Sequence, residues 1–153
     1  MTVRSEPLFL FGPGYSATAL SELWQGPVYG TVRSEKSQAT LTGTKITPIP
    51  ISEKQTIFQK LEGAHLLVSA PPSEVGCPAL QLLGDHAKRA ASVTYLSTTG
   101  VYGDLDGGWA VEWSSVRPQS DRAQRRATAE QAWQQSHEQV RLVRLPEEKK
   151  NNG

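Results

Sequence analysis

A chain of 153 residues fits one domain, because folding at this length buries roughly two thirds of the surface of the unfolded chain. Hydrophobic residues make up 37% and charged residues 20%, without a long apolar run or a block of like charge, which excludes a membrane-spanning protein and a wholly disordered one. The formal net charge of +1 gives no reason to expect the phosphate neutralisation that binding to nucleic acid requires.

The first third of the chain alternates strands and helices. Four apolar residues at 8–11 run into Gly-Pro-Gly, which predicts a strand buried on both faces of a parallel sheet. Residues 15–24 follow as a helix and residues 28–32 as a short strand. The apolar face of this helix is predicted to consist of Ala17, Leu20, Leu23 and Trp24.

The middle of the chain is less regular. Residues 34–45 are rich in Ser, Thr, Gln and Gly and indicate a degraded helix or a loop. Residues 46–51 predict a strand, and its two prolines place it at a sheet edge because proline donates no ladder hydrogen bond. Ser52 with Gln55 has the form of a capping box that opens a helix ending at Gly63.

The rest of the chain continues the alternation. Strands are predicted at 65–69, 93–97 and 140–143, and helices at 78–91 and 120–135, with an irregular stretch around Trp109 and Trp113. We therefore expect an α/β fold, a Rossmann-type doubly wound parallel sheet in the order 3-2-1-4-5-6 with helices on both faces. Its domain would span residues 1–145, and residues 146–153 read as a disordered polar tail.

A glycine-rich turn carries the functional signal. The string Gly12-Pro13-Gly14-Tyr15-Ser16-Ala17 lies between a predicted strand and a predicted helix, the context of a dinucleotide fingerprint. Gly12 permits a tight turn, Gly14 lets the backbone approach a pyrophosphate, and Ala17 lets the helix pack closely. Tyr15 and Ser16 open the helix whose N–H groups would face the phosphates. The alternative is a turn that merely needs glycine.

The end of the second predicted strand indicates which dinucleotide binds. It reads Thr31-Val32-Arg33-Ser34, without the carboxylate that holds the ribose hydroxyls of NAD. We therefore predict NADP rather than NAD, with Arg33 and Ser34 at the 2′-phosphate. A solvated Arg33 is the alternative. From fold position alone, Ala70 and Pro71 are expected to line the adenine or ribose.

Three strings together resemble the extended short-chain dehydrogenase/reductase superfamily, in its NAD-dependent epimerase/dehydratase branch. They are the glycine-rich turn, the segment Tyr95-Leu96-Ser97-Thr98-Thr99-Gly100-Val101-Tyr102-Gly103, and residues 118–130. The resemblance implies an oxidoreductase or nucleotide-sugar epimerase that acts on a small carbonyl or sugar-like substrate. It also allows a homodimer, since such proteins often pair through two helices.

Carried over by position, Thr98 takes the place of the catalytic Ser or Thr, and Ser97 flanks it beside the cofactor. Arg122 and Arg126 stand where the family has the tyrosine and lysine of its Tyr-x-x-x-Lys pair. Arginine stays protonated in proteins, so Arg122 donates hydrogen bonds but is a poor general acid or base. Arg126 is expected to bind cofactor ribose or phosphate instead of the lysine. Solvated arginines paired to residues such as Glu130 are the alternative for this helix.

The resemblance also exposes a difference in length. Extended members continue after the sixth strand into a substrate-binding region of comparable size, which the sequence does not show after residue 145. The open alternatives are an active oxidoreductase, a dinucleotide-binding or redox-sensing module without catalysis, and a truncated product.

The remaining candidate residues predict no metal site. Cys77 is the single cysteine, so no internal disulfide forms and a reducing, cytoplasmic location fits best. A small buried side chain is its expected role. His65, His86 and His137 share no metal-ligand spacing with it.

Overall fold

The structure is a computed structural model, and it describes residues 6–103 and 114–145. This part of the chain forms a six-stranded sheet in the order β3-β2-β1-β4-β5-β6, and all neighbouring strands run parallel. The predicted fold class and strand order are confirmed. The strands are β1 (Leu8–Phe11), β2 (Val28–Val32), β3 (Thr47–Pro50), β4 (His65–Val68), β5 (Ser92–Thr98) and β6 (Val140–Leu145).

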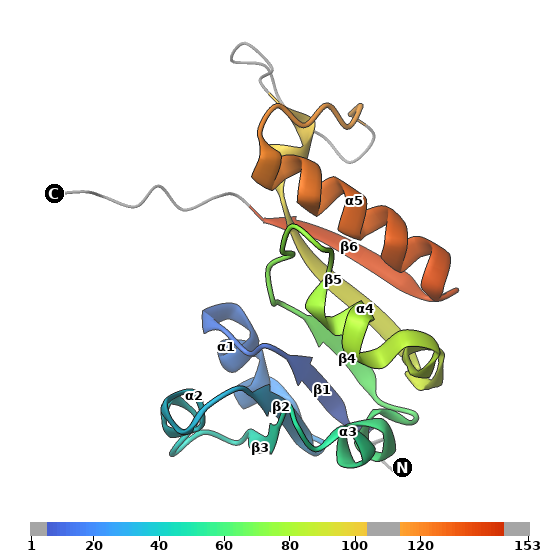
Figure 1. The fold of residues 1–153 in the computed structure, drawn as a ribbon. Helices are drawn as coiled ribbons and strands as arrows, with labels where there is room; N and C mark the ends of the chain where they lie inside the picture. The colour runs from blue at the N-terminus through green and yellow to red at the C-terminus, as the bar shows by residue number, and fades with distance from the viewer. Residues whose placement is uncertain (1–5, 104–113, 146–153) are drawn as a thin grey trace, which may run out of the picture.

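Helices cover the sheet from two sides (Figure 1). One side carries α1 (Tyr15–Leu23) and α2 (Glu35–Thr40). The other carries α3 (Lys54–Leu61), α4 (Pro78–Leu83) with the 3₁₀ helix η1 (Gly84–Arg89), and α5 (Asp121–Ser136). A second 3₁₀ helix, η2 (Thr99–Tyr102), follows β5 directly. None of the described helices has the length and apolar character needed to cross a membrane.

Strand β1 is the centre of two hydrophobic cores. Phe9 and Phe11 belong to the larger core with α3, α4 and α5, whereas Leu8 and Leu10 belong to the smaller core with α1. Since successive side chains of a strand point to opposite faces, an unbroken apolar run is what burial on both faces requires. The fully buried Trp133 of α5 anchors the larger core.

The two faces of the sheet are covered unequally. The smaller core centres on β1, β2 and β4, and its helical side chain is Ala17 of α1. Val143 and Leu145 of β6 lie on the same face as Leu96 and Thr98, and each stays 38% exposed. In the described part of the chain, the α1 side of β5 and β6 is therefore only partly covered.

The structure decides two sequence expectations about helix starts, one left open and one wrong. Residues 34–45 contain a true helix, α2, because Ser34 and Ser37 form a reciprocal capping box. The capping box predicted at Ser52 is wrong, since α3 begins at Lys54 after Glu53, whose side chain makes no cap. The N–H of Glu53 donates to Pro50, so Ser52 lies in a turn ahead of the helix.

Two helices also differ from expectation, one in its length and the other in the face that it buries. The helix predicted at 78–91 changes into a 3₁₀ helix at Gly84, whose φ of +51° lies in the left-handed region. Helix α1 turns Ala17 and Ser21 toward the sheet and leaves Leu20 and Leu23 at 37% and 80% exposure. The small inward residues let α1 approach the sheet closely, and the predicted leucine face is wrong.

Confirmed placements include the edge position of proline-bearing β3 and the burial of Cys77, which is 4% exposed. The irregular stretch around Trp109 and Trp113, and the tail predicted at 146–153, lie outside the described residues.

Candidate functional site

The turn after β1 depends on glycine at position 12. Gly12 has a φ of +71°, which side chains rarely adopt, and a Cβ there would lie 2.8 Å from the Cβ of Ala70. Ala70 is itself buried, 4% exposed, directly after β4. The backbone of the turn thus rests on the end of the neighbouring strand, and a side chain at position 12 would separate the two.

Two hydroxyl groups hold the turn in place. The N–H of Gly12 donates to Oγ1 of Thr31 at 2.9 Å, and Oγ of Ser69 donates to the carbonyl of Gly12 at 2.5 Å. Thr31 lies in β2 and Ser69 follows β4, so the carboxyl ends of three strands are joined at one residue. Neither hydroxyl is among the residues predicted from the sequence to shape this turn. The signal available was a hydroxyl residue at each of the two strand ends that flank the turn.

Gly14 has a different role, because its backbone is extended (φ −112°, ψ −160°) and suits any residue. A Cβ at Gly14 would meet no described atom within 4 Å, so open space lies above it. Gly14 is the N-cap of α1 without a side-chain cap, and the first turn holds no acidic residue. The first N–H groups of a helix lack intrahelical partners and favour anions. Tyr15 and Ser16 are exposed here, whereas Ala17 is fully buried.

The end of β2 presents an available cation. Arg33 is exposed, and no ion pair involving it is found in residues 6–103 and 114–145. Ser34 is engaged locally, since its Oγ accepts from the N–H of Ser37 at 3.2 Å as the cap of α2. Of the two residues predicted at a 2′-phosphate, Arg33 is therefore the one with free donors.

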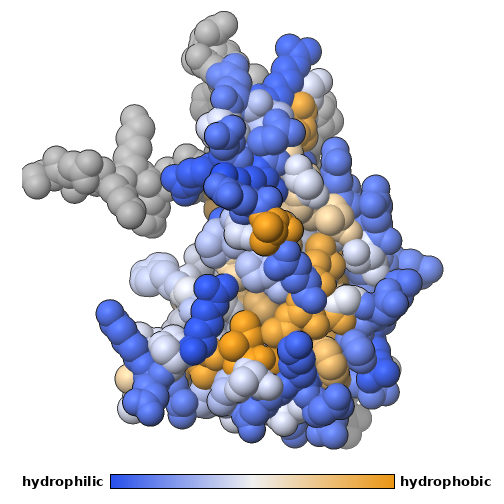
Figure 2. Space-filling model, viewed as in Figure 1, coloured by the Kyte–Doolittle hydropathy of each residue, from blue (hydrophilic) through white to orange (hydrophobic). Residues whose placement is uncertain are grey.

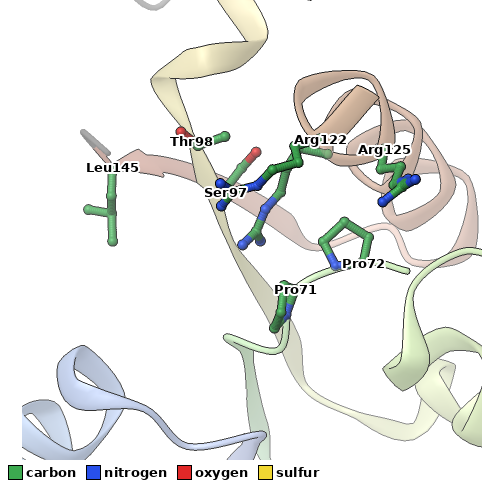
Figure 3. A pocket seen from close by; sticks show the side chains of 8 residues that line it. Pro71, Pro72, Ser97, Thr98, Arg122, Arg125 and Leu145 are labelled. Carbon is green, nitrogen blue, oxygen red and sulfur yellow. The ribbon is translucent and has the colours of Figure 1, made fainter. Parts of the chain in front are cut away.

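A second feature lies at the same sheet edge, beyond β4. It is a cavity of about 210 Å³ between the N-terminal part of α5, the loop after β4 and the ends of β5 and β6 (Figure 3). We call it the arginine pocket. Its lining residues are Pro71, Pro72, Ser97, Thr98, Arg122, Arg125, Arg126 and Leu145.

The three arginines of the pocket are held differently. Arg126 donates from Nη1 to the carbonyl of Leu96 at 2.8 Å and lies 3.4 Å from the hydroxyl of Tyr95. Arg125 pairs with Glu74 at 3.3 Å across the pocket rim. Arg122 is exposed at the start of α5 and has no ion pair within the described residues. The structure thus brings Arg122, Arg126 and Thr98 together, as the family resemblance implied.

A buried ionic network adjoins the pocket through Ser97, which lines the pocket and donates to Glu130. Glu130 of α5, 3% exposed, accepts from Ser97 at 2.5 Å and binds Arg144 of β6 through both carboxylate oxygens, at 2.6 and 3.1 Å. Arg144 also donates to the hydroxyl of Tyr102 at 2.8 Å. The alternative in which Glu130 pairs with an arginine of its own helix is wrong, because Glu130 faces the sheet and its oxygens are occupied by Ser97 and Arg144.

Neither tyrosine beside the pocket is suited to proton transfer. Burial raises the pKa of Tyr95 to about 12, and the side chain is fully buried. Tyr102 is 5% exposed and its hydroxyl is held by Arg144.

The two residues predicted to line the adenine or ribose, Ala70 and Pro71, lie in different surroundings. Ala70 packs against Gly12, whereas Pro71 is exposed and lines the arginine pocket.

Comparison with known proteins identifies the fold. A conserved protein of unknown function from Silicibacter pomeroyi is 33% identical, with a TM-score of 0.82 over 92% of this chain and 52% of that chain. A short-chain dehydrogenase/reductase superfamily protein from Agrobacterium tumefaciens with bound NAD is 16% identical, with a TM-score of 0.63 over 91% of this chain and 48% of that one. The chain has the fold of the short-chain dehydrogenase/reductase superfamily.

The epimerase/dehydratase branch of that superfamily is represented as well. The dTDP-glucose 4,6-dehydratase from Bacillus anthracis, in complex with NAD, is 14% identical, with a TM-score of 0.67 over 91% of this chain and 54% of that chain. The chain spans about half the length of each of these three solved structures. No family model and no curated protein matches it.

The network under the pocket yields a stability prediction. Glu130→Gln removes the charge that compensates the largely buried Arg144, so we expect the free energy of unfolding to fall by about 2–3 kcal/mol. Glu74→Gln is the matched control, because its ion pair with Arg125 is 83% exposed on the glutamate side and contributes less than about 0.5 kcal/mol. Urea unfolding measures both variants. Equal losses would contradict the assignment of Glu130 as a buried anchor.

Proposed function

We propose that the chain binds a nicotinamide dinucleotide across the carboxyl ends of β1 and β4, with NADP preferred over NAD. The observation that carries this proposal is the turn after β1, where Gly12 is packed against Ala70 and open space lies above Gly14. Parallel sheets bind ligands where the strand order reverses, and here β2 and β4 flank β1 on opposite sides. Structures of the same fold contain NAD, which supports the same class of ligand for this chain.

In this proposal the pyrophosphate lies against the start of α1. Gly14 allows close approach of the backbone, and the N–H groups of Tyr15, Ser16 and Ala17 face the phosphates. The 2′-phosphate of NADP meets Arg33 at the end of β2, with the Ser34 hydroxyl beside it. Pro71 borders the cofactor after β4, while Ala70 acts from beneath by supporting Gly12.

The nicotinamide end then reaches the arginine pocket, where a reaction would occur. Thr98, with Ser97 at its side, would orient the substrate oxygen, and a bound nicotinamide would supply hydride chemistry at a carbonyl or sugar carbon. Arg122 and Arg126 stabilise negative charge on that oxygen by donating hydrogen bonds. Arg126 also contacts the nicotinamide ribose, in the place of the family lysine. The chain would thus be an oxidoreductase or epimerase-like enzyme.

A second candidate function is dinucleotide binding without turnover. The lining residues of the arginine pocket are Pro, Ser, Thr, Arg and Leu, none of which has an ordinary pKa near neutrality. General acid–base catalysis works best with such a group, whereas burial raises the pKa of Tyr95 to about 12 and the hydroxyl of Tyr102 is held by Arg144. This observation favours a sensing or binding module over an efficient enzyme.

The cofactor site is tested by a pair of glycine variants. Gly14→Ala keeps an allowed backbone and places a methyl group where the pyrophosphate must lie, so NADPH binding should weaken at least about tenfold, or 1.4 kcal/mol. Its unfolding free energy should fall by no more than about 1 kcal/mol. Gly12→Ala strains the turn and should cost about 1–3 kcal/mol of stability. Nicotinamide fluorescence and thermal melting measure the two effects. Unchanged NADPH affinity in Gly14→Ala would remove the pyrophosphate from this turn.

The preference for NADP is tested at Arg33. Arg33→Gln deletes the cation proposed for the 2′-phosphate, so the dissociation constant for NADPH should rise about tenfold. NADH lacks this phosphate and serves as the internal control, with a change smaller than about twofold. Parallel weakening of both cofactors would show that Arg33 does not discriminate between them.

Turnover separates the two candidate functions. The binding module predicts saturable NADPH binding with no oxidation of NADPH by carbonyl substrates in the unaltered chain. Steady-state NADPH oxidation by a panel of small carbonyl compounds provides the measurement. Oxidation by the unaltered chain eliminates the module, and oxidation that appears only after Arg122→Tyr with Arg126→Lys supports it.

A further inference from the structure

Among the residues that the structure describes, the arginine pocket carries more positive charge than its neighbours neutralise. Strongly hydrophilic residues gather over the N-terminal part of α5, above the more hydrophobic middle of the same face (Figure 2). Three of the eight lining residues are arginines and none is acidic. Among the described residues nearby, Glu74 neutralises Arg125, Glu130 is bound by Arg144, and the exposed Asp121 in the first turn of α5 forms no ion pair. Arg122 and Arg126 have no ion pair within residues 6–103 and 114–145.

Arg126 is oriented before any ligand arrives. Its Nη1 donates to the carbonyl of Leu96, and its guanidinium lies 5.9 Å from the ring centre of Tyr95. A guanidinium has five N–H donors in a planar fork, so most of its donors remain for a ligand. Arg122 lies one turn earlier on the same helix, which aligns the two side chains along one face. The side chain of Arg122 projects from α5 into the cavity above Pro71 (Figure 3).

We propose that the arginine pocket binds a carboxylate or phosphate group, and that the chain's substrate or regulatory ligand is therefore a small anion. As a statement about substrate, this inference rests on the proposed function. Arg122 and Arg126 supply donors, Thr98 lines the same cavity while its hydroxyl accepts from the N–H of Gly100, and the N-terminal end of the 16-residue helix α5 adds partial positive charge. A volume of about 210 Å³ suits a small anionic molecule and is too small for a dinucleotide.

The phosphates of the cofactor are also anions, so they are the second candidate occupant of the arginine pocket. In the proposed binding mode they lie at α1 and Arg33, whereas the pocket is lined from α5, β5, β6 and the loop after β4. No residue of the glycine-rich turn lines the pocket. The anion site and the sites of the cofactor phosphates are therefore neighbours with separate cations.

The test uses nitrogen-15 NMR of the arginine Nε–H groups of the full chain. Inorganic phosphate and succinate are titrated separately at constant ionic strength, with sodium chloride making up the difference. We expect saturable shifts of the Arg122 and Arg126 signals with at least one anion, and at least about tenfold weaker binding in Arg122→Gln. Arg122 is exposed, so this variant keeps its fold, which circular dichroism checks. Arg89→Gln, an exposed arginine on η1, is the matched control and should bind like the unaltered chain.

The outcomes separate the two proposals. Absence of saturation, or equal affinity in Arg122→Gln and Arg89→Gln, overturns the anion site even if NADPH binds. Anion binding in a chain that does not bind NADPH supports the pocket and overturns the cofactor proposal alone. The titration is repeated with NADPH at saturation. Retained anion binding supports an anionic substrate or regulator, and displacement by NADPH overturns that assignment in favour of the cofactor itself as the occupant of the pocket.

Discussion

The contact between Gly12 and Ala70 sets the shape of the carboxyl edge of the sheet. Without a side chain at Gly12, the chain leaving β1 turns sharply and rests on the first residues after β4. Thr31 and Ser69 then fix this turn from β2 and from the end of β4. Helix α1 consequently starts above the point where the strand order reverses, with its N–H groups toward open space. A larger residue at position 12 would move the helix start and close the geometry that the proposed cofactor needs.

The charged residues of α5 have two different roles. Glu130 is buried and bound by Arg144 and Ser97, so it is not available to neutralise Arg126 one turn away. Arg126 is fixed by the carbonyl of Leu96, and Arg122 remains exposed. The helix thus uses one buried ion pair to dock on β6 and leaves two guanidinium groups facing the pocket. Two arginines stand where the family resemblance implies a Tyr-x-x-x-Lys pair, and guanidinium groups suit the proposed anion recognition better than proton transfer.

Sequence reasoning succeeded where local chemistry and global topology agree. The apolar run of β1, the prolines of β3 and the glycine-rich turn each allow few placements, and the structure has all three where they were predicted. It failed where the outcome depends on contacts across the fold. The leucines of α1 have helical spacing, yet the sheet accepts the smaller Ala17 and Ser21. The partner of Glu130 comes from β6, and no spacing along α5 reveals it. The hydroxyls that hold Gly12 belong to other strands, so only their positions at strand ends pointed to them.

The central claim is that backbone amides at the start of α1 bind the pyrophosphate of a dinucleotide. Amide chemical shifts of the nitrogen-15-labelled chain during addition of NADPH test it most directly. The account predicts the largest saturable shifts at Gly14, Tyr15 and Ser16, with a second group at Arg33. Saturable shifts confined to other parts of the sheet, or no saturable shift at millimolar NADPH, would contradict it.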